Sequence, residues 1–312
     1  MSYSDEALAF STIPTDHQVR LEDRVSFLYL EYCVVRQDKT GVIAYGGDIE
    51  KGVIAGKRVQ LPVSGLAVLM LGPGTSITQP AISSCTRAGT TVMFTGGGGV
   101  PSYSHATPLT SSARWAIAQA RLVAQEKHQK VAALVLYKKQ LGLDHMPGGT
   151  IASMRGIEGR TIRNLYQSTA KKYKLQLFRR DTNAEDNVNI ALNISNSILY
   201  GCAAAACAAI GVNPALGVIH RGNARSLLFD LADLYKPSLT IPVAFACHNS
   251  EDVAQEVRAG VRKELIRQDV LKGMLQTLME ILTPHLPERD DDRLISERGD
   301  EVAGHTQYGS RE

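Results

Sequence analysis

The chain has few cysteines, and this scarcity excludes one common way of holding a fold together. Its 312 residues include five of them, at positions 33, 85, 202, 207 and 247. An odd number of cysteines without CxxC spacing predicts neither a disulfide framework nor a structural zinc site. Free thiols are typical of a reducing compartment, so we expect a cytoplasmic protein.

Long apolar runs are also missing, and we expect no secretory leader. The most apolar run, residues 198–212, is shorter than the roughly 20 residues that cross a bilayer. Asn189, Asn193 and Asn196 precede it. We therefore expect a tightly packed internal helix and no membrane partner. The N-terminal stretch MSYSDEALAF is acidic and polar, which is unlike a signal peptide.

Motifs of several common enzyme classes are absent. The glycine run at residues 96–99 is not followed by GK[ST], so we interpret it as a flexible turn and not as a phosphate loop. The sequence has no GxGxxG fingerprint. Ser102, Ser104 and His105 lie close together, but the GxSxG elbow of serine hydrolases is missing.

Charge is unevenly distributed along the chain. Residues 287–312 contain four arginines and eight acidic residues, a balance of −4. Because the whole chain has a formal net charge of +3, residues 1–286 carry a net charge of +7. A basic body with an acidic tail suits a polyanionic partner. From charge alone, an ordinary uneven distribution of charged residues with no functional meaning is an equally good explanation.

The hydrophobic pattern changes once along the chain. Up to about residue 104 it predicts five short strands, at RVSFLYLEYCVV, GVIAYGG, KRVQLPV, LAVLML and TTVMFT, with one helix at 78–87. Beyond it the period is helical. We expect a long helix capped by Thr110 or Ser111 and running through residue 140, followed by helices at 150–174, 186–211, 224–235, 250–268 and 269–283.

The pattern as a whole predicts an α+β protein. We expect an N-terminal antiparallel β-sandwich-like domain at residues 1–106 and an all-α-helical catalytic domain at 107–286. The acidic residues 287–312 are predicted to form a disordered tail, because they are highly charged and poor in aromatic residues.

Two aspartates lie on a strongly apolar predicted helix. Asp230 and Asp233, in FDLADLYK, are three residues apart, so both carboxylates point to one helix face. The leucines around them leave little polar face to be solvated. Burying such carboxylates is costly unless a cation neutralises them, which favours a metal site.

A glutamate stands in a second island, RGIEGR. Glu158 lies between two glycines, with Arg155, Arg160 and Arg163 close in sequence. Taken alone, this island fits a surface ion pair equally well. The glycines favour a functional role, because they let a backbone or a phosphate approach closely.

A histidine stands in a third island, VIHRGN. For a lone histidine such as His220, a structural hydrogen bond is the commoner role. Arg221 and Arg225 follow it, and they favour an anionic substrate beside the imidazole.

Two carboxylates and an imidazole form a ligand set that fits Mg²⁺ or Mn²⁺. Such an ion polarises a phosphoryl oxygen and lowers the pKa of a bound hydroxyl or water. The predicted chemistry is an in-line attack on a phosphodiester. The residues by themselves leave open whether water or a DNA 3′-hydroxyl attacks.

The order of several segments resembles the CRISPR-associated integrase family, and within it the subtype I-E branch. These segments are RVSFLYLEY, DKTG, LMLGPGTSI, RGIEGR, LYG, GVIHRGN, FDLADLYK and EVR, between about residues 21 and 285. The resemblance implies an adaptation endonuclease-integrase with an N-terminal β domain for dimer and DNA contacts. Homodimers would be bridged by a small ferredoxin-like CRISPR-associated adaptation protein. The reaction would join the 3′-hydroxyl ends of double-stranded prespacer DNA to CRISPR leader-repeat DNA by transesterification.

The resemblance also implies roles for particular residues. Glu158, His220 and Asp233 would be the catalytic metal ligands, with Asp230 as a supporting catalytic carboxylate. Tyr32 would stack on the prespacer end, although it fits a strand core equally well. Tyr200 would lie near the catalytic centre, with helix packing as its alternative. The resemblance implies nucleic-acid contacts for Tyr32, Arg114, Arg163, Tyr200, Lys236 and Arg258. Arg160, Arg221 and Arg225, named above for their places beside Glu158 and His220, complete the expected nucleic-acid-binding residues.

The sequence departs from the family at two positions of the β domain. Ser76 and Pro101 stand where close relatives place arginines, so the DNA path there would use other bases such as Arg58 or Arg87. Two other functions stay open: a stand-alone metal-dependent nuclease for branched or single-stranded DNA, and a non-catalytic DNA-binding scaffold. An integrase yields joined products, a nuclease yields only cut ends, and a scaffold yields neither.

Overall fold

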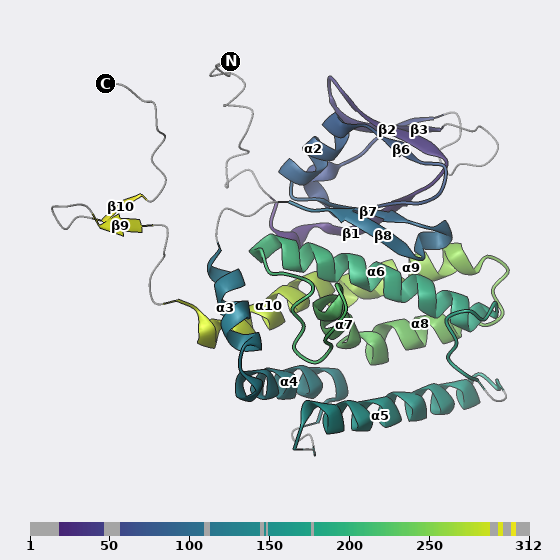
Figure 1. Cartoon of the computed structure of the whole chain (residues 1–312). Helices are drawn as coiled ribbons and strands as arrows, with labels where there is room; N and C mark the ends of the chain where they lie inside the picture. Colours follow the sequence, from purple (N-terminus) through teal and green to yellow (C-terminus); the bar gives the residue numbers. More distant parts are fainter. Residues whose placement is uncertain are drawn as a thin grey trace.

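A computed structural model describes residues 19–46, 57–108, 113–143, 147, 149–175, 178–287, 293–295 and 301–303. Two four-stranded sheets are followed by a helical bundle, as Figure 1 shows. The predicted α+β class, with a β-rich first part and a helical second part, is confirmed. The expected helix caps at Thr110 and Ser111 lie outside the described residues.

The first sheet, sheet A, contains strands in the order β1-β5-β7-β8. Their bounds are Val25–Leu30, Leu66–Leu71, Thr91–Thr95 and Ser102–Ala106. β1, β5 and β7 run parallel, and only β8 is antiparallel to its neighbour. The predicted antiparallel arrangement is therefore wrong for this sheet. A parallel pair needs a crossover, and helix α2, Gln79–Arg87, supplies it between β5 and β7.

The second sheet, sheet B, has the order β4-β3-β2-β6. Its strands are Arg58–Gln60, Gly41–Gly46, Cys33–Asp38 and Ser76–Ile77. The segment RVSFLYLEYCVV was expected to form one strand. It forms two, β1 and β2, which lie in different sheets. Tyr32 separates them with a left-handed backbone, φ 50°, and its N–H donates to the Pro73 carbonyl at 2.9 Å.

Sheet A is buried on both faces. Leu30, Leu69 and Leu71 join a small core with α2 and sheet B, whereas Tyr29 and Met70 belong to the core of the helical bundle. Burial on both faces explains the uninterrupted apolar run of β5, because no face has to be polar. The helical core therefore continues into the β-rich part of the chain.

The helical part follows the predicted periods with two exceptions. Its helices are α3 (Arg114–Val123), α4 (Glu126–Leu141), α5 (Ile151–Lys172), α6 (Asn187–Ile210), α7 (Ser226–Asp233), α8 (Ile241–Ala246), α9 (Val253–Arg267) and α10 (Val270–Leu282). The predicted long helix is two, α3 and α4, because Gln125 is extended. α8 was not predicted; it follows a π turn at Lys236–Thr240.

Helix α6 lies at the centre of the bundle and contacts α7, α8, α9, α10 and sheet A (Figure 1). At Gly201 a Cβ would stand 2.6 Å from Met93 Sδ, so a larger residue there would require the Met93 side chain to move. By length and composition α6 could span a membrane, but 83% of its apolar window is buried inside the fold. The predicted packed internal helix is confirmed, and all five cysteines are buried free thiols.

The acidic tail is described only in part. Arg293–Ile295 and Glu301–Ala303 form an antiparallel ribbon, β9 and β10. Figure 1 draws this ribbon apart from the helical bundle. These six positions are therefore paired strands and not the disordered chain that composition predicts, and the other residues after Pro287 lie outside the described part.

Candidate functional site

Asp230 anchors the loop that precedes α7. Its carboxylate accepts hydrogen bonds from the backbone N–H groups of Val218, Ile219 and His220, at 2.6, 3.1 and 2.9 Å. His220 Nδ1 lies 2.8 Å from Asp230 Oδ1. Burial of Asp230 agrees with the sequence, but no cation is needed for it: four N–H groups satisfy this carboxylate.

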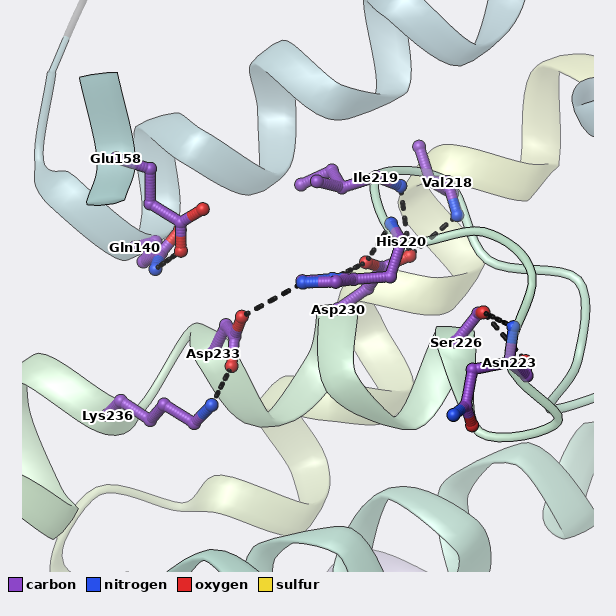
Figure 2. A network of polar contacts seen from close by, with 10 residues as sticks. All are labelled: Gln140, Glu158, Val218, Ile219, His220, Asn223, Ser226, Asp230, Asp233 and Lys236. Atoms are coloured by element: carbon purple, nitrogen blue, oxygen red, sulfur yellow. Dashed lines mark hydrogen bonds and ion pairs between the residues drawn. The ribbon is translucent and has the colours of Figure 1, made fainter. Parts of the chain in front are cut away.

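His220 connects the two aspartates of α7. Because Nδ1 is held by Asp230, the opposite nitrogen Nε2 faces Asp233, with its Oδ2 at 4.0 Å (Figure 2). The hydrogen bond that His220 donates to Asp230 raises the pKa of His220 above its ordinary value, against the opposing effect of burial. Metal-binding histidines are usually oriented in this way: one ring nitrogen donates to a carboxylate, and the other points toward the metal ion and its other ligands.

Asp233 is also buried, with 9% of its surface exposed. Its Oδ1 atom forms an ion pair with Lys236, one turn further along the chain. Burial alone would lower the pKa of Lys236, but the charge of Asp233 raises it above its ordinary value. The three-residue spacing predicted from sequence therefore does place both aspartates on one face, where His220 lies against them.

Glu158 approaches the same region from α5. Gln140 Nε2 donates to its Oε1 at 2.8 Å, and both residues are drawn in Figure 2. Burial raises the pKa of Glu158, an effect that the Gln140 hydrogen bond opposes. Among the described residues Glu158 forms no ion pair with a neighbouring arginine, so the surface-pair alternative is wrong. A Cβ at Gly156 or Gly159 would meet open space.

A cavity of about 640 Å³ opens beside these residues. Glu158, Asp233 and Lys236 line it, together with Arg163, Arg179 and Arg180. Tyr166 and Phe178 add aromatic surface, with ring centroids 5.7 Å apart. The wall of the cavity thus contains both carboxylates and guanidinium groups. Such a wall suits an anion that must be brought to a cation between carboxylates.

Aromatic residues pack against the imidazole. Phe229 lies edge-on to His220, with ring centroids 5.8 Å apart, and edge-on to Tyr200 at 5.2 Å. Arg225 Cζ is 5.5 Å from the Phe229 ring, and Lys236 Nζ is 5.9 Å from the Tyr200 ring. Tyr200 and Arg225 therefore lie next to the site, as expected.

Arg160 and Arg221 are exposed, two residues after Glu158 and directly after His220. Three other predicted nucleic-acid contacts pack elsewhere. Arg258 packs over the Tyr29 ring at 4.0 Å, where α9 meets sheet A. Arg114 Cζ lies 5.6 Å from the Trp115 ring at the start of α3. Tyr32 lies at the junction of β1 and β2, in the other part of the molecule.

Sequence reasoning missed four residues that shape the site: Gln140, Tyr166, Arg179 and Arg180. Arg180 donates to Asn189 Oδ1 at 3.0 Å and to Asn193 Oδ1 at 2.5 Å, which fixes the segment before α6. The dipeptide Arg179-Arg180 and the asparagine spacing of α6 were visible in the sequence. Their relation to Glu158 was not, because the fold alone brings these segments together.

The donor set fits a divalent cation. Two ligands, each about 2.1 Å from one ion, can stand up to about 4.2 Å apart, and the 4.0 Å between His220 Nε2 and Asp233 Oδ2 lies within that span. Glu158 lines the same cavity as Asp233. Within the described part of the chain, however, no three or more His, Cys, Asp or Glu side chains stand close enough together to hold one metal ion.

Comparison with known proteins places this chain in a family. The family model "CRISPR associated protein Cas1" matches residues 137–277, which contain all four candidate catalytic residues. A CRISPR-associated endonuclease of Thermus thermophilus is 34% identical over 280 residues, covering 87% of this chain and 84% of the relative. A CRISPR-associated endonuclease of Escherichia coli is 28% identical and covers 85% of this chain and 87% of its own length.

Solved structures give the same result. The chain in a TtCas1–DNA complex superimposes with a TM-score of 0.75 at 32% identity, over 90% of this chain and 100% of that one. A casposase bound to an integration product shares only 12% identity, and its TM-score of 0.64, over 84% of this chain and 92% of that one, shows a common fold alone. By sequence identity along most of its length, this chain belongs to the Cas1 family of CRISPR-associated proteins.

Proposed function

We propose that this protein is a metal-dependent DNA integrase and endonuclease of CRISPR adaptation, of the subtype I-E branch, acting in the cytoplasm. One observation carries the proposal. Asp230 and His220 form a hydrogen-bonded pair directed at Asp233, and Asp233 and Glu158 line one cavity together with three arginines. The comparisons add that a related Cas1 protein was solved with DNA and that a protein of this fold was solved with an integration product.

Glu158, His220 and Asp233 would hold Mg²⁺ or Mn²⁺, and the bound ion would supply Lewis-acid activation of the scissile phosphodiester. Asp230 holds the imidazole by its Nδ1 atom and keeps Nε2 directed at Asp233. Gln140 restrains the Glu158 carboxylate. Arg163, Arg179 and Arg180 would bind the DNA phosphates, since they line the same cavity. For joining, a prespacer 3′-hydroxyl would attack the scissile phosphorus in line, and the 3′-oxygen of the cut target strand would leave and take up the proton. For cleavage, water would attack in its place.

The assembly is part of the same proposal. Residues 1–106 would provide dimer and DNA contacts, residues 107–286 would carry the catalysis, and residues 287–312 would form an appended tail. The active unit would be a homodimer, two of which are bridged by the small ferredoxin-like adaptation protein. Tyr32 and Arg258 lie on or against the strands of the first part, away from the cavity, where contacts to the prespacer duplex are proposed.

The test is a joining assay. Purified protein is mixed with a supercoiled plasmid carrying a repeat and with a labelled short duplex that has free 3′-hydroxyls. Reactions contain Mn²⁺ or EDTA, with and without the small partner, beside Glu158→Ala. We expect label transfer to the plasmid that requires the metal and disappears in the variant. Nicking without transfer would support the stand-alone nuclease, and no metal-dependent product would support the scaffold.

A second variant separates chemistry from binding. His220→Ala removes the imidazole that connects the two aspartates, so we expect joining to be lost. Prespacer binding, measured by fluorescence anisotropy, should persist, because the arginines of the cavity are unchanged. Loss of binding in a folded His220→Ala protein would make His220 a DNA-contact residue instead.

A further inference from the structure

Lys236 is the cationic partner of a candidate metal ligand. It is the first residue of the π turn, three residues after α7 ends at Asp233. Its ammonium group forms an ion pair with Asp233 Oδ1, while Asp233 Oδ2 is 4.0 Å from His220 Nε2. The Lys236 side chain is 22% exposed and lines the cavity. Asp233 thus has a resident counter-ion on one oxygen.

This ion pair and a metal ion make competing demands on one carboxylate. An ammonium group and a divalent cation bound to the same group would stand a few ångströms apart and repel each other. Asp233 is buried, so water screens that repulsion only weakly. Binding of a cation therefore favours a position of Lys236 away from Asp233.

The cavity offers Lys236 another partner once DNA is bound. Arg163, Arg179 and Arg180 line the same cavity, so a phosphate held by them lies in the space that Lys236 also borders. The flexible lysine side chain forms a charge-assisted contact with phosphate readily. The ring of Tyr200 lies 5.9 Å from Nζ. Its face attracts the ammonium group and therefore stabilises Lys236 as it moves away from Asp233.

We propose that Lys236 acts as an exchangeable counter-ion that couples metal binding to DNA binding. Without DNA it neutralises Asp233 and weakens the metal site. With DNA it moves to a phosphate and leaves Asp233 to the metal. By linkage, metal and DNA then raise each other's affinity by the same factor. The inference rests on the proposed metal site, and it assigns Lys236 a regulatory role in addition to phosphate binding.

The experiment measures Mn²⁺ affinity by titration calorimetry in the absence of DNA. Lys236→Met keeps the length of the side chain and removes the charge. We expect it to bind Mn²⁺ at least about tenfold more tightly than the native protein, since a nearby like charge is gone. The matched control is Lys139→Met, which breaks a surface ion pair with Glu280 (2.8 Å) and should leave Mn²⁺ affinity unchanged.

The second measurement is the same titration with a short duplex present. The native protein should gain Mn²⁺ affinity on DNA binding by a larger factor than Lys236→Met. The proposal is overturned if folded Lys236→Met, without DNA, binds Mn²⁺ no more tightly than the native protein. It is also overturned if DNA raises the Mn²⁺ affinity of the two proteins by the same factor. If the native protein binds no Mn²⁺ in either condition, the metal site itself is refuted, and the proposed function falls with it. Circular dichroism establishes that each variant is folded.

Discussion

At the scale of single residues, Asp230 shows how a buried carboxylate is kept in place without a metal. Three backbone N–H groups and one imidazole nitrogen surround it. Removing the carboxylate leaves those donors unpaired in the interior, and each unpaired buried donor costs about 1–3 kcal/mol. Asp230 is therefore a structural support of the site as much as part of it.

We expect Asp230→Ala to lower the free energy of unfolding by about 3–5 kcal/mol, the range found when one partner of a buried pair is removed. Urea denaturation followed by circular dichroism measures the change. The control is Asp252→Ala, which removes an exposed helix cap on Gln255 N and should cost about 1 kcal/mol. Similar costs for the two variants would contradict the role given to Asp230.

The pair of Asp230 and His220 also predicts a pH dependence. The hydrogen bond to Asp230 raises the pKa of His220 in the folded protein above the ordinary 6.5. The folded state therefore binds this proton more tightly. Its stabilising contribution is fully present below the unfolded pKa and is lost as the pH rises through the folded pKa.

We expect the native protein, in EDTA, to exceed His220→Gln in unfolding free energy by more at about pH 6 than at about pH 9. In the difference between the two unfolding free energies, the contributions of the titratable groups that both proteins share cancel. A stability advantage that grows toward alkaline pH would show that His220 is held in its neutral form in the fold.

At the scale of elements, α3 fixes the loop that leads to His220. The buried Gln119 donates from Nε2 to the carbonyls of Asn213 and Leu216, both at 2.8 Å. Its Oε1 accepts from Asn213 N, also at 2.8 Å. The site loop is thus tied to a helix almost a hundred residues earlier, and the imidazole depends on that connection for its position.

We expect Gln119→Leu to cost about 1–3 kcal/mol in stability and to reduce the rate of joining while the protein remains folded. The control is Gln129→Leu on α4, where Nε2 donates to the Val123 carbonyl at 3.0 Å, away from the site loop. That variant should lose stability but keep its joining rate when assayed below its melting temperature. Equal rate losses would mean that the loop does not depend on Gln119.

At the scale of the whole molecule, charge separates the body from the tail. The body carries +7 and the tail −4. Long-range attraction to DNA follows the net charge and is screened by salt within about 10 Å at 0.1 M. We therefore expect the acidic tail to compete with DNA for the basic surface, in a way that salt weakens.

We expect deletion of residues 287–312 to leave the melting temperature nearly unchanged and to tighten non-specific duplex binding at low salt. The gain should shrink as salt rises, because both interactions are electrostatic. Anisotropy titrations over a salt series measure it. A large fall in melting temperature would instead mean that the tail, including its β9–β10 ribbon, packs on the body.

Much of the architecture could be predicted from the sequence. The change from period two to helical period marks where the helical part begins, and five of the helices after it were placed within a few residues. Strand direction was not predictable, because a short apolar run has the same pattern in parallel and antiparallel sheets. Tyr32 and Gln125 broke continuous patterns through backbone conformations that the pattern does not encode.

The sequence by itself determined the donor chemistry of this protein: two aspartates one turn apart, an imidazole, and a glutamate between glycines. These identities follow from residue type and local period, which are properties of neighbouring residues. Only the tertiary structure decided that Asp230 is satisfied by the loop of His220 and that Arg179 and Arg180 share a cavity with Glu158 and Asp233. Those relations join different elements of the chain, and packing of α5, α6 and α7 around one core sets them.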